Sequence, residues 1–177
     1  MSPLIRLRRA TPVFIILVVV AGFAIPQSGQ AVVPAPDGGY PGGNTAEGQR
    51  ALFALTTGGF NTAVGYLSLT SDATASSNTA LGAGALLANT GNENTATGIV
   101  ALFKNTGGTF NTANGGFALF NNTEGTENTA LGDTALANNT TGDNNTAIGV
   151  TALGNNTTGG SNTAIGIRCW FKSNYWE

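Results

Sequence analysis

The sequence predicts an all-β protein, a repetitive parallel β-solenoid or β-roll in which each coil has about 17 residues. Three observations favour this class. The tripeptide Asn-Thr-Ala recurs at spacings of 17 residues, with a single spacing of 16. The same small and polar residues return at the same places in each unit, and only 9% of all residues are charged. Periods of this length are typical of solenoids, in which neighbouring repeats build the core between them.

Residues 1–31 have the features of a secretory signal peptide. A basic start with three arginines precedes an apolar run over residues 13–25, and the small residues Gly29 and Ala31 suit cleavage after Ala31. The run is shorter than the roughly 20 residues of a membrane span, which favours a cleaved signal over a membrane helix. We expect contact with a membrane only through this segment. An uncleaved N-terminal anchor is the alternative. We therefore expect a secreted or cell-surface protein.

Residues 32–43, "VVPAPDGGYPGG", are rich in Pro and Gly and predict an extended leader without a core of its own. After cleavage the chain keeps four basic residues against nine acidic ones, a net charge of −5. It has no cluster of Lys and Arg of the kind that binds phosphate backbones, so nucleic acid is not an expected partner.

The predicted solenoid spans residues 44–166, with seven full units and the start of an eighth. The common phrase is Asn-Thr-Ala-x-Gly-x-x-Ala-Leu, numbered here as positions one to nine. In a stack of coils, the Asn at position one can form a ladder in which each side-chain amide bonds to those above and below. These residues are Asn44, Asn61, Asn78, Asn94, Asn111, Asn128, Asn145 and Asn162.

The segment Thr-Ala-x-Gly predicts a short strand, with Ala and Gly on one side and the variable position four on the other. The glycine at position five indicates either a positive φ at a corner or a close backbone approach. These corner glycines are Gly48, Gly65, Gly82, Gly98, Gly115, Gly132, Gly149 and Gly166.

The leucine at position nine is the expected core residue of each coil. The seven are Leu52, Leu69, Leu86, Leu102, Leu119, Leu136 and Leu153. The segment Gly-x-x-Ala-Leu that contains it fits either a second short strand or a single helical turn. The following segment, usually Asn-Thr-Thr-Gly, closes the coil, because Asn and Gly tolerate left-handed turn geometry.

Each coil offers one Leu and two Ala as dependable apolar groups, which is little against the conformational entropy lost on ordering it. Packing of positions four and six against another chain would bury more apolar surface. We therefore expect a homo-oligomer, in the first place a trimer. Positions four, six and seven would also give the rod its ligand specificity. Apolar examples at positions four and six are Val64, Tyr66, Ile99, Ile148, Val150, Ile165 and Ile167.

The last unit, residues 167–177, is degenerate, with Cys169 and Trp170 where Ala and Leu belong. Its aromatic residues either cover the open end of the solenoid, as terminal repeats do, or mark a chain truncated from a longer parent. Truncation is the preferred interpretation, since nothing else supplies an anchor.

The Asn-Thr-Ala-x-Gly-x-x-Ala-Leu units over residues 44–166 resemble the head repeats of trimeric autotransporter adhesins. A similar phrase occurs in bacterial and phage-tail-fibre-like repeat proteins. The adhesin resemblance implies a left-handed parallel β-roll, three chains side by side, and a host or surface ligand outside the cell. The chain departs from both groups, because it carries neither a coiled-coil stalk and β-barrel nor a C-terminal chaperone domain.

Composition argues against an enzyme. The chain has no histidine and one cysteine, so Ser-His and Cys-His pairs cannot form, and no metal or other cofactor is expected. Glu124 and Glu127 are interpreted as solvated turn charges, Cys169 as an unpaired thiol, and the Asn-x-Thr sequons as by-products of the repeat. The expected function is structural or adhesive, with a surface or carbohydrate ligand. A phage-tail-fibre-like segment and an ice- or carbohydrate-binding solenoid are the alternatives.

Overall fold

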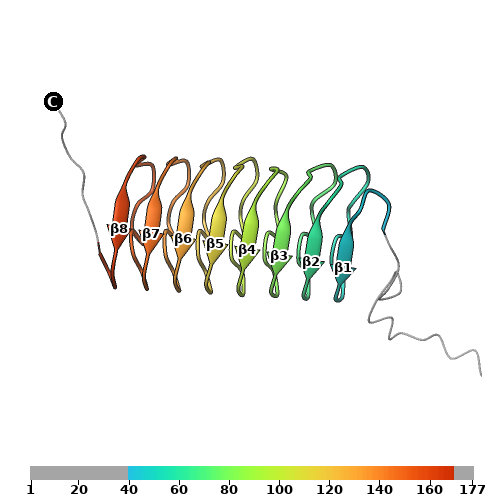
Figure 1. Cartoon of the computed structure of the whole chain (residues 1–177), viewed down its shortest axis with the longest axis horizontal. Coiled ribbons are helices and arrows are strands. Elements are labelled where there is room, and N and C mark those ends of the chain that lie inside the picture. Colours follow the sequence, from blue (N-terminus) through green and yellow to red (C-terminus); the bar gives the residue numbers. More distant parts are fainter. Residues whose placement is uncertain (1–39, 170–177) are drawn as a thin grey trace, which may run out of the picture. The chain divides into compact units, whose positions relative to one another are not determined.

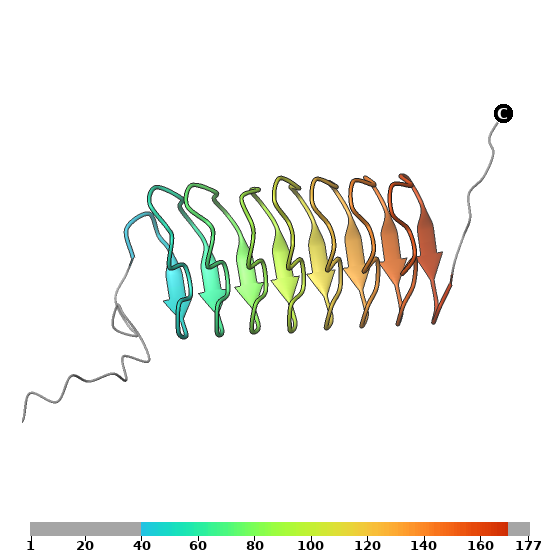
Figure 2. The ribbon, with the colours of Figure 1, turned by 180° about the vertical axis from the view of Figure 1, so that it is seen from behind.

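The computed structural model describes residues 40–169, which form eight short strands, one in each coil. Figures 1 and 2 show the strands side by side with the same direction and with loops connecting them around each coil. The predicted signal peptide, the leader up to residue 39 and the end of the chain from Trp170 lie outside the described residues. The strands are β1 (Thr45–Glu47), β2 (Thr62–Val64), β3 (Thr79–Leu81), β4 (Thr95–Thr97), β5 (Thr112–Asn114), β6 (Thr129–Leu131), β7 (Thr146–Ile148) and β8 (Thr163–Ile165).

All eight strands belong to one parallel sheet in sequence order, and each residue pairs with its counterpart in the next coil. The 16-residue unit keeps this register, since Thr79 pairs with Thr95. The missing residue is taken from the closing turn before Asn94, where the shorter unit reads "NTGNE". The structure thus confirms the predicted class, an all-β parallel β-solenoid with coils of about 17 residues.

The strands alternate between the interior and the surface. The alanine at position three is buried in every strand, while the threonine before it and the variable residue after it lie outward. Ala and Leu side chains of successive coils form one continuous hydrophobic core along the solenoid. The leucines at position nine are among its largest members, and those from Leu69 to Leu136 are 0% exposed.

The corner glycines are required for two reasons at once. Their φ angles lie between 121° and 142°, a region that L-residues rarely adopt. They also stack backbone against backbone: a Cβ on Gly115 would lie 2.4 Å from the carbonyl oxygen of Gly132. Both physical reasons suggested by the sequence therefore act at the same position.

The segment from position five to position nine is a turn, neither a second strand nor a helical turn. Positions seven and nine have left-handed φ angles in residues that do not favour them, such as Val100 (49°) and Leu119 (51°). Bonds between coils continue through this turn, because the Leu119 N–H donates to the Ala135 carbonyl oxygen over 3.0 Å. Stacking thus compensates for a local conformation that leucine would avoid in isolation.

No helix within residues 40–169 has the length and apolar character to span a membrane.

We predict that Gly115→Ala destabilises the solenoid by at least about 2 kcal/mol, because alanine combines an unfavourable φ with a backbone clash. The adjacent Gly116→Ala is the matched control, since its Cβ would meet side chains alone, the flexible carboxylate of Asp133 at 2.9 Å and the Ile99 methyl group at 3.4 Å. Urea unfolding followed by circular dichroism measures both. Equal stability of the two variants would contradict the proposed role of the corner glycines.

Candidate functional site

The asparagines at position one are buried and hold each coil to the next. In every pair of neighbouring coils the Asn Oδ1 accepts the backbone N–H of the following Asn, over 2.8–3.0 Å. From Asn94 onward, each Oδ1 also accepts the side-chain amide of the next rung, as Asn111 does from Asn128 over 3.1 Å. Direct amide-to-amide bonds of the predicted kind therefore occur in the later coils, whereas the backbone contact runs through all of them.

Most of these asparagines also close their own coil. The Asn128 Nδ2 donates to the carbonyl oxygen of Gly142, fourteen residues later, over 2.8 Å. The same bond joins Asn44 to Gly58 and Asn111 to Gly125. One side chain thus connects the start of the strand to the end of the closing turn, and the ladder fixes both the shape and the stacking of the coil.

A second ladder runs through position twelve, in the closing turn, and sequence reasoning missed it. From Asn105 onward, each Nδ2 donates to the Oδ1 of the preceding rung over 2.7–2.8 Å and, over 2.7–2.9 Å, to a glycine carbonyl three residues later. At the first rung, the Asn89 Nδ2 donates to the Gly91 carbonyl oxygen over 2.7 Å. The sequence interpretation assigned these asparagines to local turn geometry. Their recurrence at one position of the repeat is the signal from which this ladder could have been predicted. The rungs are Asn89, Asn105, Asn122, Asn139 and Asn156.

Asp72 occupies position twelve in the second coil, where the later coils have asparagine, and it is fully buried. Its Oδ1 accepts the Ala75 N–H over 2.9 Å, and its Oδ2 accepts the Asn78 amide over 3.4 Å. Burial raises the pKa of the Asp72 carboxyl to about 6, and the two hydrogen bonds only partly oppose this shift. The column therefore contains one titratable group in otherwise neutral surroundings.

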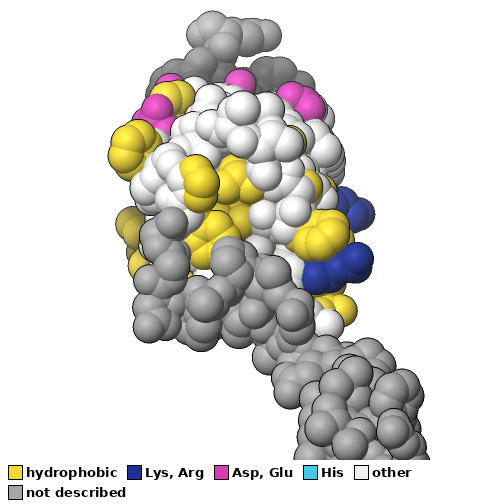
Figure 3. Space-filling model, turned by 90° about the vertical axis from the view of Figure 1, so that its right-hand side faces the viewer, with side chains coloured by type: hydrophobic (Ala, Val, Ile, Leu, Met, Phe, Trp, Pro, Cys, Tyr) yellow, Lys and Arg dark blue, Asp and Glu magenta, His cyan; other side chains and the backbone are white. Residues whose placement is uncertain are grey.

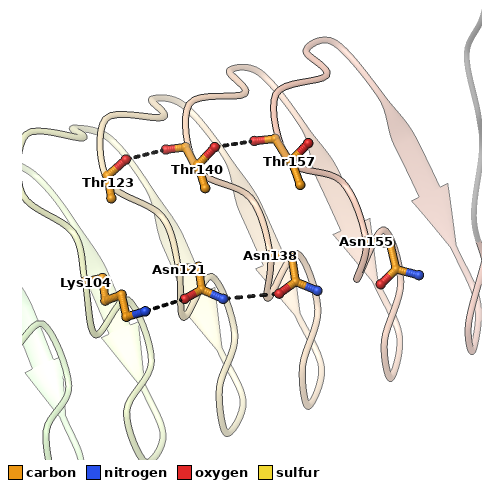
Figure 4. A pocket seen from close by; sticks show the side chains of 7 residues that line it. All are labelled: Lys104, Asn121, Thr123, Asn138, Thr140, Asn155 and Thr157. Carbon is orange, nitrogen blue, oxygen red and sulfur yellow. Dashed lines mark hydrogen bonds between the residues drawn. The ribbon is translucent and has the colours of Figure 1, made fainter.

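The outer surface of the closing turns carries an open groove of about 480 Å³. Figure 4 shows its two rows of side chains, one at position eleven and one at position thirteen, contributed by successive coils. The first row consists of Lys104, Asn121, Asn138 and Asn155, and the second of Thr123, Thr140 and Thr157.

Side chains within each row are held by hydrogen bonds that all point toward the C-terminal coils. Lys104 Nζ donates to Asn121 Oδ1 over 2.8 Å, and Asn121 Nδ2 donates to Asn138 Oδ1 over 3.1 Å. In the other row, the Thr123 hydroxyl donates to the Thr140 carbonyl oxygen over 3.0 Å. The Thr140 hydroxyl donates in the same way to Thr157 over 2.9 Å. The groove is thus a preorganised polar surface.

The sequence interpretation assigned ligand specificity to positions four, six and seven, which are not among the groove residues. In the structure many side chains at these positions are outward and apolar, for example Leu131 and Phe117. Of the other residues that the sequence analysis considered, Glu124 and Glu127 are exposed, and Cys169 is a half-buried free thiol. No three His, Cys, Asp or Glu side chains are grouped as metal ligands within residues 40–169.

No protein-family model, curated protein or solved structure matches the chain. The fold and the repeat define a class, the parallel β-solenoid repeat proteins, with about 17 residues in each coil.

We predict that stability falls as the pH rises from about 4 to about 6, because folded Asp72 binds its proton more tightly than the unfolded chain does. A shift of about two pH units corresponds to about 3 kcal/mol, present below pH 4 and lost by pH 7. Asp72→Asn removes this slope. Urea unfolding at pH 4 and pH 7 measures it, with the exposed Asp133→Asn as control. If the pH dependence of the unfolding free energy persists in Asp72→Asn, it arises from other titratable groups.

Proposed function

We propose that this chain is a non-enzymatic secreted or cell-surface repeat protein, whose rigid solenoid has a structural and adhesive role. The contrast between its interior and its surface carries the proposal. Inside, the same Asn, Ala and Leu columns recur in coil after coil. Outside, the side chains change from coil to coil on strands that stay in register. Such a rod displays varied side chains at a fixed spacing of about 4.8 Å.

The resemblance of the repeats to trimeric autotransporter adhesin heads supports an adhesive role, and the signal-like residues 1–31 support export and cleavage near Ala31. A host-surface or carbohydrate molecule is the proposed ligand, and nucleic acid is not proposed, since the described residues carry few and scattered basic groups. Figure 3, a view toward the β1 end, shows the visible Lys and Arg side chains on one side and the Asp and Glu side chains on another.

We further propose that copies of the chain associate side by side as a trimer. Apolar side chains at positions four and six lie outward beside the strands and remain exposed in a single chain, for example Leu131 at 45%, Ile99 at 56% and Ile165 at 67%. Exposed apolar surface of this kind marks interaction sites. Association through these positions would bury it without disturbing the ladders.

An ice-binding function has one observation in its favour, the row of outward threonines at position two on eight strands in register. The next outward position does not continue this pattern. It is Thr97 in β4 but Leu81 in β3 and Ile148 in β7, so the strand face lacks a second threonine row. The phage-tail-fibre alternative has the same rod architecture. It differs in the larger assembly to which the rod would belong, a tail fibre in place of a cell surface.

For adhesion, we expect beads coated with the full chain to be retained on a plate coated with bacterial biofilm matrix several-fold more than beads coated with albumin. Expression of the full chain in a bacterium should also leave it accessible to external protease or in the medium. A chain that is retained in the cytoplasm and gives no bead retention would contradict the proposal.

For assembly, light scattering after size exclusion should give three times the mass of one chain. Leu131→Glu places a charge on the outward strand face and should lower the measured mass, whereas Asn138→Glu in the groove, outside the strands, is the control. A stable folded monomer of the unmodified chain would exclude the trimer and leave adhesion untouched.

A further inference from the structure

The groove formed by positions eleven and thirteen is a hollowed surface of polar side chains that the repeat architecture leaves without a role. Neither row is needed to close the coil, because the buried ladders at positions one and twelve do that. The groove follows the axis of the solenoid and spans the coils from Lys104 to Thr157 (Figure 4). Its direction suits an extended chain molecule lying along the rod.

The hydrogen-bonding capacity left in the groove indicates the chemistry of the ligand. The Thr123 and Thr140 hydroxyls donate their only proton to a backbone carbonyl, so toward a ligand they can only accept. The Asn121 amide uses one of its two N–H groups on Asn138, so a second donor remains. A ligand must therefore donate to the threonine row and both donate and accept along the asparagine row. Hydroxyl groups do both.

The charges of the groove favour a neutral ligand over a polyanion. Lys104 is the only basic residue among the seven lining residues. Its ammonium group already donates to Asn121 and lies 5.3 Å from the centroid of the Phe120 ring. Phe120 in turn stacks on Phe103 with the ring centroids 5.2 Å apart, so Lys104 is held at one end of the groove. An anionic polymer would find no further basic partner along the rows.

The distance between successive coils indicates which polymer shape fits the groove. The rungs repeat at the strand spacing of about 4.8 Å. The sugar units of an extended β-1,4-linked polysaccharide advance by a similar distance, whereas an α-1,4-linked chain curls away from a straight groove. Because the side chains are already fixed by their rows, a ligand in register loses little free energy to ordering them.

We propose that this groove binds a neutral, linear, β-1,4-linked polysaccharide along the solenoid axis, with about one sugar unit on each coil. The inference rests on the proposed adhesive function and names the ligand class of that role.

The test is isothermal titration calorimetry of the full chain with cellotetraose, cellobiose, maltotetraose and polygalacturonate. Cellotetraose should bind at least ten-fold more tightly than cellobiose, which covers fewer coils, and than maltotetraose, which has the same units in a curled chain. No binding of cellotetraose, equal binding of maltotetraose, or binding of polygalacturonate alone would overturn the proposal.

A matched pair of double variants locates the site. Asn138→Leu with Thr140→Val removes polar atoms from both rows and should weaken cellotetraose binding at least ten-fold. Thr112→Val with Thr129→Val also removes two polar groups, at exposed positions of β5 and β6 outside the groove and outside positions four and six, and should leave binding unchanged. Unfolding midpoints check that both double variants fold. If the Asn138→Leu, Thr140→Val variant does not fold, Thr123→Val replaces it.

The two proposals fail separately. If beads coated with the groove variant adhere to biofilm matrix as well as the unmodified chain does, the adhesive function stands and the groove is not its binding site. If the unmodified chain binds cellotetraose but does not adhere, the groove stands and the adhesive role falls.

Discussion

The solenoid depends on buried asparagine amides that lie in register from one coil to the next. A coil of this size contains little apolar volume, and its interior must also satisfy the carbonyl groups of its own turns. The amides at positions one and twelve meet both needs, since they bond to glycine carbonyls within the coil and to amide oxygens between coils. Every buried side-chain polar atom in the described part of the chain has a hydrogen-bond partner. A column satisfied in this way stabilises a unique register, because a shifted rung would bury unpaired polar groups.

The backbone geometry follows from this stacking. To bring position one and the closing turn together, each coil turns sharply after the strand, at a glycine whose backbone lies against the next glycine. It then passes through left-handed conformations at positions seven and nine, where leucine and valine occur. Local preference opposes such φ angles. They persist because each turn bonds to the same turn in the next coil, so the strain is distributed over the whole array.

A fixed interior leaves the surface free to vary, and the proposed function rests on that division. The buried columns tolerate little change, and the replacement of asparagine by Asp72 makes that one rung sensitive to protonation. The outer columns carry apolar residues beside the strands and polar rows on the closing turns. One face thus carries the exposed apolar residues through which association is proposed, and another presents the groove of polar side chains.

The sequence by itself determined the period, the parallel register, the inward alanines, the corner glycines and the leucine core, because each follows from one residue type recurring at one position. The recurrence of Asn at position one likewise indicated a ladder. Tertiary structure decided the rest. The turn at Leu119 has a conformation that leucine alone does not favour, the second ladder uses asparagines that local turn geometry already explained, and Asp72 looks like an ordinary turn residue. The groove between Asn138 and Thr140 is likewise absent from any single unit. These features arise from contacts between residues one coil apart, and local preferences along the chain do not contain them.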